Sequence, residues 1–437
     1  VVAHGSFELA DYPQAEYAYA QVLTATPEDD ESHAEFVDNL AASIYKQGEL
    51  ANDAQDYRSA ADHFLRIRST APTSTIRATA EYDAGAALIR LEDWTQAAEV
   101  LEAFRSTFPE HELQAEATKQ IAFAYRENEQ LSRAAGEYER IASESEDPAI
   151  RSEALLVAGD LYEQSDDPDG ALYVYLLFVE EFPQPVEMAL ETRLKIAEIH
   201  KAAHDESLYR DELEEIVRID AEAGPERTAR TRTIAGRSAL VLAERLYEDF
   251  VAVKLLQPFE VSLQEKQQRM DRTIEAMGRL VDYEISEVTA AATYYMAEAY
   301  FDFSLSLAES ERPTDLEPAE LADYELVLEE EAFPFEEKAI DLHEENVELL
   351  QAGVFNSWTE DSLGKLAELV PGRYAKNEMS SEFPGTIDRY VYWSPASQIY
   401  GPTFETVDAM PLDEPADTTY LVPMDVVDGG MHDADPQ

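Results

Sequence analysis

The sequence has no cysteine among its 437 residues. This absence excludes disulfides, thiol catalysis and thiolate metal sites. It fits an oxidising compartment as well as a reducing one, so it assigns the protein to neither. Because the sequence begins at Val1 rather than at methionine, we expect a processed or truncated N-terminus, and the sequence leaves open whether a signal peptide or a lipid anchor preceded it.

Basic residues are scarce as well. The chain has 33 lysines and arginines against 92 aspartates and glutamates, which gives a net charge of −59. Binding to the phosphates of nucleic acid or to an anionic membrane surface would work against this field. Two interpretations of the acidity remain, a surface that captures basic partners and adaptation to high salt. Salt adaptation is favoured, because the acidity runs through the whole chain and only nine of the basic residues are lysines.

Long apolar runs and enzymatic signatures are also missing. No run approaches the roughly 18 to 20 apolar residues of a membrane span, so no transmembrane span is expected in these residues. There is no glycine-rich phosphate loop and no G-x-S-x-G nucleophile elbow. We therefore predict that the chain is not an enzyme and needs no cofactor.

Two groups of residues resemble metal ligands but are too incomplete to predict a site. His200 and His204 lie four residues apart, which would place both on one helical face, yet no third ligand is specified. The stretch "DVVDGGMHDAD", residues 425–435, lacks the calcium-loop pattern with its terminal glutamate. A packing role for His200 is favoured, and no metal site is predicted.

What the sequence does contain is an internal repeat. "LEDWTQAAEVLEAFRSTFP", residues 91–109, places Trp94, Ala97, Leu101 and Phe104 on one helical face before Pro109. The same pattern recurs four more times, and its alanines are separated by 45, 37, 37 and 37 residues. These anchor alanines are Ala15, Ala60, Ala97, Ala134 and Ala171. Identical intervals indicate repeated structural units rather than one compact core.

Each repeat is predicted to be a helical hairpin. The helix that precedes each anchor helix carries a small residue, such as Gly85 or Gly159, which lets the two helices approach closely. Aromatic residues such as Trp94 and Tyr175 are expected to fill the space between helices, and proline to end the second helix. One hairpin cannot bury its apolar face alone, so stacking of hairpins is expected.

This small–aromatic–alanine–aromatic–proline pattern resembles the tetratricopeptide repeat over residues 1–220, in about six hairpins of which the first is incomplete and the sixth degraded. The period of 37 exceeds the usual value of about 34, as in the longer repeats of bacterial cell-envelope proteins. The resemblance implies an all-α solenoid of helical hairpins, wound as a right-handed superhelix, with an irregular C-terminal arm.

The rest of the chain follows the repeat less closely. Residues 221–376 are predicted to form divergent helical repeats, with an insertion near 310–332 and a capping helix at "TEDSLGKLAELVP". Residues 377–437 are acidic, aromatic and without helical periodicity. Either a disordered tail or an extended arm that docks on a solenoid fits this composition.

A second resemblance concerns residues 309–378, which include the segment "EEEAFPFEEKAIDLHEEN". This block looks like the C-terminal region of tetratricopeptide proteins encoded beside bacterial biopolymer-transport motors of the Tol and gliding-motility type. The resemblance implies a location in the periplasm, at the outer membrane or outside the cell.

One segment departs from the general acidity. "PERTARTRTIAGR" carries Arg227, Arg230, Arg232 and Arg237 against only Glu226, a local charge of +3. These arginines either pair with acidic neighbours on adjacent helices or form a docking point for an acidic segment such as the C-terminus of this chain.

Together these patterns predict a non-enzymatic scaffold that binds envelope proteins through the solenoid surface. The alternative is a structural protein whose solenoids stack head to tail into filaments or sheaths and exchange C-terminal arms.

Overall fold

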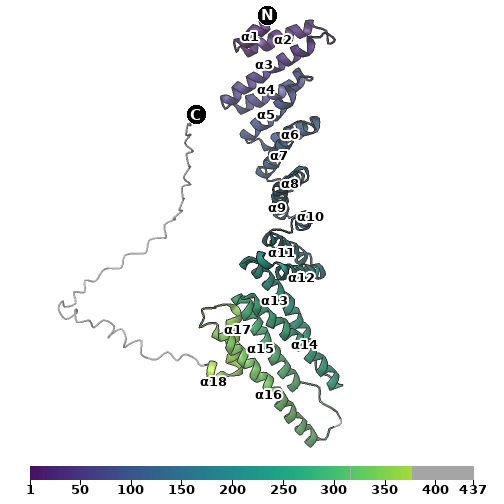
Figure 1. Cartoon of the computed structure of the whole chain (residues 1–437), viewed down its shortest axis with the longest axis vertical. Coiled ribbons are helices and arrows are strands. Elements are labelled where there is room, and N and C mark those ends of the chain that lie inside the picture. The colour runs from purple at the N-terminus through teal and green to yellow at the C-terminus, as the bar shows by residue number, and fades with distance from the viewer. Residues whose placement is uncertain (315, 376–437) are drawn as a thin grey trace, which may run out of the picture. The chain divides into compact units, whose positions relative to one another are not determined.

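The computed structural model describes residues 1–314 and 316–375. The predicted C-terminal arm, and with it the aspartates of residues 425–435, lies outside this described part. The described residues are mostly helical and contain no strand, and helices that follow one another in the sequence pack side by side (Figure 1). The predicted all-α solenoid is therefore confirmed.

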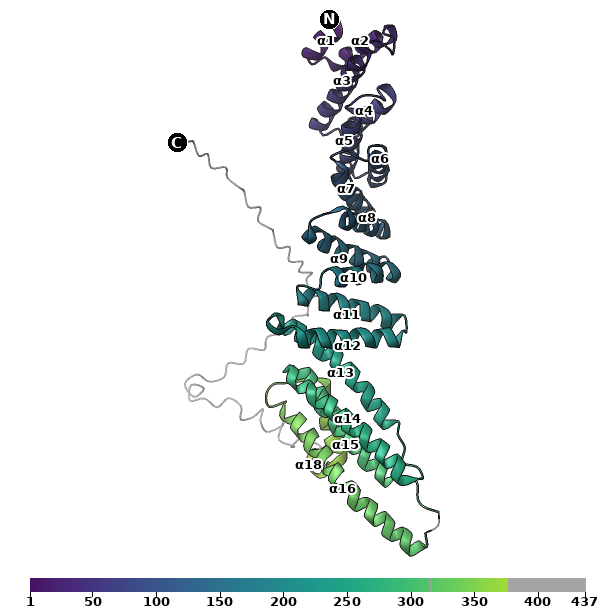
Figure 2. The same cartoon turned by 45° about the vertical axis from the view of Figure 1, so that its right-hand side comes forward.

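Residues 1–222 form six helical hairpins (Figures 1 and 2). The first helices of the hairpins are α1 (Val2–Glu8), α3 (His33–Asp53), α5 (Arg77–Arg90), α7 (Gln114–Glu127), α9 (Pro148–Gln164) and α11 (Val186–Ala202). The second helices are α2 (Tyr12–Ala25), α4 (Tyr57–Thr70), α6 (Trp94–Thr107), α8 (Leu131–Glu144), α10 (Pro168–Glu181) and α12 (Glu206–Glu222). Among the first helices, α3 contacts α5 and α5 contacts α7 directly, so these three helices form one continuous face.

The turn inside each hairpin is built the same way every time. The second residue before each second helix has a left-handed backbone, with φ between 56° and 62°. These residues are Ala10, Gln55, Glu92, Glu129, Asp166 and His204. In five of the six turns the next residue is an aspartate whose carboxylate accepts a hydrogen bond from a backbone N–H of the first helical turn. This bond satisfies one of the N–H groups that lack a partner at a helix start.

This turn corrects the expectation for His200 and His204. Helix α11 ends at Ala202, and His204 has φ of 58°, so the two histidines do not share a helical face. His200 is buried on α11, in the packing place predicted for it. In the described residues no group of three or more His, Asp or Glu side chains is placed to hold a metal ion.

The proline at the end of the second helix is less important than the pattern suggested. Helices α4, α6 and α10 end two residues before Pro72, Pro109 and Pro183. Helix α8 has no such proline, yet it has the same 14 residues as those three. Its next residue, Ser145, adopts an extended backbone and ends the helix without help from proline.

Residues 224–375 continue as four long helices and two short ones, with short 3-10 turns at η1 (Gly224–Glu226) and η2 (Val281–Tyr283). The helices are α13 (Ala229–Val251), α14 (Phe259–Leu280), α15 (Ser286–Ala308), α16 (Pro318–Glu348), α17 (Ser357–Leu369) and α18 (Pro371–Tyr374). None of the helices in the described residues combines the length and hydropathy that a membrane span needs.

The insertion predicted near 310–332 is helical over most of its length. Helix α16 begins at Pro318, where a proline costs no hydrogen bond, and continues for 31 residues. It includes Pro334, which lies on the exposed side of the helix, where water can satisfy the carbonyl group that loses its partner. The inserted residues thus lengthen the helix at its N-terminal end rather than forming a loop.

The predicted capping helix corresponds to α17, which is joined to α15 and α16 by a buried polar cluster. His343 on α16 is fully buried, with Nδ1 3.2 Å from the Ser362 hydroxyl and Nε2 3.3 Å from the Glu298 carboxylate. Lys365 lies 3.1 Å from the same carboxylate. Burial alone would raise the pKa of Glu298, but His343 and Lys365 outweigh it and hold that pKa below its usual range.

Candidate protein-binding surface

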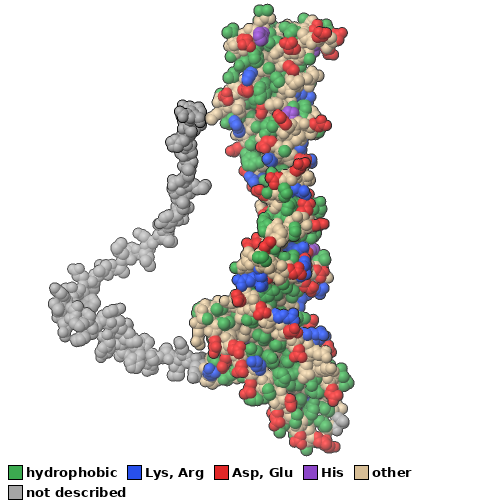
Figure 3. All heavy atoms as spheres, viewed as in Figure 1, with side chains coloured by type: hydrophobic (Ala, Val, Ile, Leu, Met, Phe, Trp, Pro, Cys, Tyr) green, Lys and Arg blue, Asp and Glu red, His purple; other side chains and the backbone are tan. Residues whose placement is uncertain are grey.

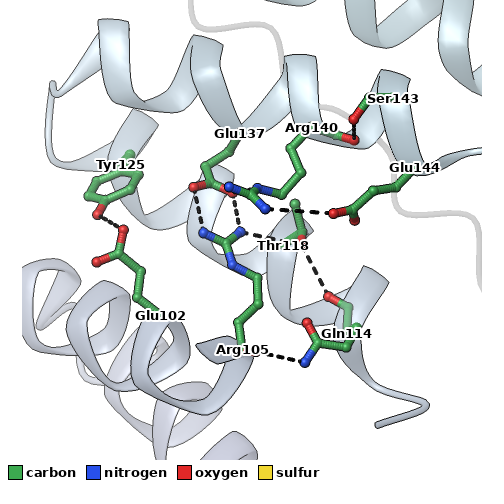
Figure 4. Close-up of polar contacts among 9 residues, drawn as sticks. All are labelled: Glu102, Arg105, Gln114, Thr118, Tyr125, Glu137, Arg140, Ser143 and Glu144. Carbon is green, nitrogen blue, oxygen red and sulfur yellow. Dashed lines mark hydrogen bonds and ion pairs between the residues drawn. The ribbon is translucent and has the colours of Figure 1, made fainter. Parts of the chain in front are cut away.

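Neighbouring hairpins are held together by arginines near the ends of second helices. Figure 4 shows Arg105 of α6, whose guanidinium donates to both carboxylate oxygens of Glu137 on α8 and to the Thr118 hydroxyl on α7. The Gln114 amide of α7 donates to the carbonyl oxygen of Arg105 at 3.0 Å. One arginine therefore links three consecutive helices, through a planar group that suits a carboxylate.

The equivalent arginine one repeat earlier forms a similar link. Arg68 of α4 donates to Glu81 of α5, and Arg77 of α5 donates to the same carboxylate at 2.8 Å. The Glu81 side chain is only 1% exposed. Burial alone would raise the pKa of Glu81, but the two guanidinium groups outweigh it and hold that pKa below its usual range. These links join each of the two second helices to the hairpin that follows it.

The first helices α3, α5 and α7 carry two adjoining hollows. The hollow between α3 and α5 has a volume of about 410 Å³, and that between α5 and α7 about 350 Å³. Both are lined by Ala86 and Arg90 of α5, so the two hollows adjoin across three helices. Ala86 stands where the repeat has Glu49 and Phe123, and its short side chain leaves the space open. We call this feature the Ala86 groove.

Two large apolar side chains are exposed among the mostly polar residues that line the Ala86 groove. Leu50 on α3 is 56% exposed, and Phe123 on α7 is 36% exposed. The Phe123 ring is held by an edge-on contact with Trp94, whose ring centre is 5.7 Å away. Exposed large apolar side chains on both sides of a hollow are typical of a site that receives an apolar side chain from a partner.

Hydrogen bonds between first helices fix the groove in place. The Tyr45 hydroxyl on α3 donates to Asp83 on α5, and the Gln120 amide on α7 donates to the Tyr82 hydroxyl on α5 at 2.6 Å. Burial raises the pKa of both Tyr45 and Asp83. Each bond spans 38 residues, about one repeat, so the same contact is made twice along the groove.

The charges in the groove nearly balance. Its lining includes Lys46, Arg90 and Lys119 with the acidic Glu49, Asp53, Asp83 and Glu116. Lys46 and Lys119 pair with acids of their own helices, Glu49 at 2.5 Å and Glu116 at 3.5 Å. Exposed pairs of this kind contribute little to stability and exchange readily. The groove is therefore close to neutral in a chain of net charge −59.

The residues predicted to pack the repeat lie between the helices. All five anchor alanines are on second helices, and all are fully buried: Ala15, Ala60, Ala97, Ala134 and Ala171. Gly85 and Gly159 are buried on first helices, against Leu101 and Tyr175 respectively. Trp94 begins α6 and is half-buried. None of these residues lines the groove, and the Trp94 ring contacts the lining residue Phe123.

The four arginines of the basic segment all pair with acids. Arg227 lies 2.8 Å from Asp220, Arg230 2.7 Å from Glu191, Arg232 3.1 Å from Glu284 and Arg237 2.6 Å from Glu287. These are the acidic neighbours expected by one of the two interpretations. Asp220 is buried, whereas the Arg230 and Arg237 side chains are 53% and 60% exposed.

Sequence reasoning missed the Ala86 groove. Ala86 belongs to no repeated pattern, and nothing in its own helix tells an exposed alanine from a buried one. Aligning the repeats at their interval of 37 residues would have revealed the hollow. Glu49, Ala86 and Phe123 then occupy equivalent positions, and their side chains differ greatly in size.

Comparison with known proteins supports the repeat. Residues 79–111, which include most of α5 and all of α6, match the family model described as tetratricopeptide repeat. The chain therefore contains a tetratricopeptide repeat, and the position of the match agrees with one of its hairpins. A search of the curated proteins gave no match.

Several solved structures are similar to this chain at low identity. A tetratricopeptide repeat protein from Parabacteroides merdae ATCC 43184 is 12% identical, with 66% of this chain and 98% of that chain covered and a TM-score of 0.27. The TPR domain of P58(IPK) is 11% identical, with 86% and 98% covered and a TM-score of 0.20. Because both TM-scores are below 0.5, the fold assignment depends on the helices of this chain and on the family match.

Proposed function

We propose that this chain is a scaffold that binds a segment of a partner protein in the Ala86 groove. The observation that supports it is the pair of adjoining hollows over α3, α5 and α7, where Leu50 and Phe123 are exposed on a face fixed by hydrogen bonds. Stacked helical repeats offer extended surfaces of this kind to other polypeptides. The partner segment would place an apolar side chain over Ala86, between Leu50 and Phe123.

The groove proposal is tested by filling the hollow. Ala86→Phe occupies the space that the partner side chain would need, and Ala149→Phe adds the same ring at an exposed alanine of α9 outside the groove. Both variants, with the unchanged protein, are immobilised and exposed to an extract of the source cells. A groove partner is retained by the unchanged protein and by Ala149→Phe but lost with Ala86→Phe. Equal retention by all three would refute the proposal.

We further propose that the scaffold works in the bacterial envelope, as the resemblance of residues 309–378 implies. Fractionation of source cells checks this location with an antibody against the chain. Recovery in the periplasmic or outer-membrane fraction supports it, and recovery with the cytosolic markers contradicts it.

The filament interpretation predicts a different behaviour in solution. A self-assembling solenoid forms larger particles as its concentration rises, because a head-to-tail contact need not close. Light scattering coupled to size exclusion, at low and multi-molar salt and with or without residues 378–437, separates the two functions. Assembly that depends on those residues would favour filaments with arm exchange, whereas a monomer at every concentration favours the scaffold.

A further inference from the structure

A second hollow lies where the regular repeat ends, between α11, α12 and α13. It has a volume of about 270 Å³. Its floor consists of Tyr209, Leu213 and Ile234, each at most 4% exposed, and Leu194 and Val241 lie at its sides. None of its lining residues belongs to the Ala86 groove. We call this feature the α11–α13 hollow.

The rim of the α11–α13 hollow is basic. Lys201 of α11 and Arg230 and Arg237 of α13 line it together with a single acid, Glu198. The Lys201 ammonium lies over the Tyr209 ring, 5.4 Å from its centre. Figure 3 shows basic side chains close together at the level of α11 to α13, whereas acidic side chains are spread along the whole of this face. Lys201 lies 3.8 Å from Glu198, so the three cations and their glutamate partners balance locally in a chain of net charge −59.

The ion pairs of the two arginines on the rim are exposed and can exchange for others. Arg230 and Arg237 each pair with one glutamate, Glu191 and Glu287, and all four side chains are 42% to 60% exposed. Such pairs contribute little, because water competes for both charges. A carboxylate held over the hollow by apolar contacts can replace either glutamate and make charge-assisted hydrogen bonds with the guanidinium.

We propose that the α11–α13 hollow binds an acidic peptide segment of a partner protein, with an aliphatic side chain in the hollow and flanking carboxylates on Arg230 and Arg237. The apolar floor and the basic rim together select this chemistry, since a basic segment would meet three cations and a neutral one would leave the rim unused. The remaining acidity of the chain is no obstacle at physiological salt, where charges more than about 8 Å away are largely screened. The inference rests on the proposed scaffold function but concerns a separate site.

The proposal is tested with a fluorescently labelled peptide that alternates leucine with glutamate, and with the same peptide carrying glutamine in place of every glutamate. Binding to the full chain is measured by fluorescence anisotropy at physiological salt. The acidic peptide is expected to bind at least about tenfold more tightly than its glutamine form, as expected for charge-assisted contacts with two arginines. Equal binding of the two peptides would overturn the basic-rim assignment.

Variants then locate the site. Arg230→Gln with Arg237→Gln is expected to weaken binding of the acidic peptide by about tenfold or more. Arg210→Gln is the matched control, because Arg210 is an exposed arginine on α12 that does not line the hollow. Thr233→Phe fills the hollow without changing its charge and is expected to weaken binding as well. Circular dichroism confirms that each variant keeps its helices.

The proposals for the two sites are tested independently of each other. Ala86→Phe is expected to leave binding of the acidic peptide unchanged, so a failed groove experiment does not affect this one. If Ala86→Phe abolishes the binding, or if Arg210→Gln weakens it as much as the paired substitution does, the peptide does not bind in the α11–α13 hollow and the proposal is wrong.

Discussion

The absence of one methyl group sets the distance between α9 and α10. A Cβ atom on Gly159 would lie 2.1 Å from Cε1 of Tyr175, which is closer than two carbon atoms can approach. The Tyr175 ring cannot move aside easily, because it is fully buried and its hydroxyl donates to Asp160 or Glu163 at 2.9 Å. Glycine at this place is therefore a requirement of packing rather than of backbone conformation.

Gly159→Ala is expected to lower the free energy of unfolding by about 1 to 3 kcal/mol, the usual cost of an overpacked core. Gly136→Ala on α8 is the control, since its Cβ atom would lie 4.0 Å from the nearest neighbouring atom. Gly136→Ala should stabilise by about 0.5 to 1 kcal/mol, because alanine favours a helix more than glycine does. Thermal unfolding followed by circular dichroism measures both, and shifts of the same sign would contradict the packing argument.

Glu81 makes stability depend on pH in a definite direction. Its pKa is lower in the folded chain than in the unfolded one, so its ionised form stabilises the fold above the unfolded value of about 4.3. That stabilisation is lost as the pH falls through the folded value. Glu81→Gln should therefore lower the unfolding temperature most near pH 7, by a margin that shrinks toward about pH 3. A margin that stays constant with pH would show that the loss comes from packing alone.

At the scale of the element, each hairpin is defined by its turn. The left-handed residue reverses the chain, and the aspartate after it starts the second helix. Helix α8 is the exception, because Gln130 stands at its N-cap and makes no side-chain hydrogen bond there. A glutamine side chain is too long to reach the N–H groups that a capping aspartate reaches.

Gln130→Asp is expected to raise the free energy of unfolding by about 1 kcal/mol, and Asp93→Ala to lower it by a similar amount. The two substitutions change equivalent places in neighbouring hairpins, so each serves as the other's reference. Chemical denaturation with guanidinium chloride measures both effects. A destabilising Gln130→Asp would mean that the α8 turn differs from the others despite its similar backbone angles.

The repeat could be predicted from the sequence because each hairpin carries its own pattern of small and aromatic residues. The anchor alanines and their interval predicted the hairpins, since a buried small residue recurs wherever two helices must come close. The capping aspartates recur four residues before the anchors Ala15, Ala60, Ala97 and Ala171, so this second signal was present but unused. The sequence did not show that the insertion near 310–332 is helical, because prolines usually interrupt a helix, whereas Pro318 begins α16 and Pro334 lies on its exposed side.

The candidate sites were less predictable, because the exposure of a side chain depends on which helices pack around it. Phe123 is exposed where Ala86 leaves a gap, and no pattern within α7 distinguishes it from a core phenylalanine. The basic segment was visible in the sequence, but the floor of the α11–α13 hollow was not. Tyr209 and Ile234 are brought together there by packing of α13 against two earlier helices.

At the scale of the whole molecule, charge and core are organised differently. The buried apolar side chains form several separate clusters along the described residues. The net charge of −59 acts on the whole chain and opposes the compact state through self-repulsion. Added salt shortens the range of this repulsion and should favour folding.

The unfolding temperature is expected to rise by several degrees between about 0.05 M and about 1 M sodium chloride, where the screening length falls from more than about 10 Å to about 3 Å. Circular dichroism during heating measures the change. A flat response would show that paired charges already cancel the repulsion, and it would count against salt adaptation as the reason for the acidity.

The uniform turn has a consequence for changes in chain length. Removing residues 93–129 would delete one period and join Glu92 to Gln130, so a left-handed residue would again precede an N-cap position. The shortened chain keeps every later turn in place between its two helices, whereas a deletion that does not join two equivalent turns places helical residues where the chain must reverse. Gain or loss of whole repeats is thus a way for such a protein to change its length without forming a new kind of turn.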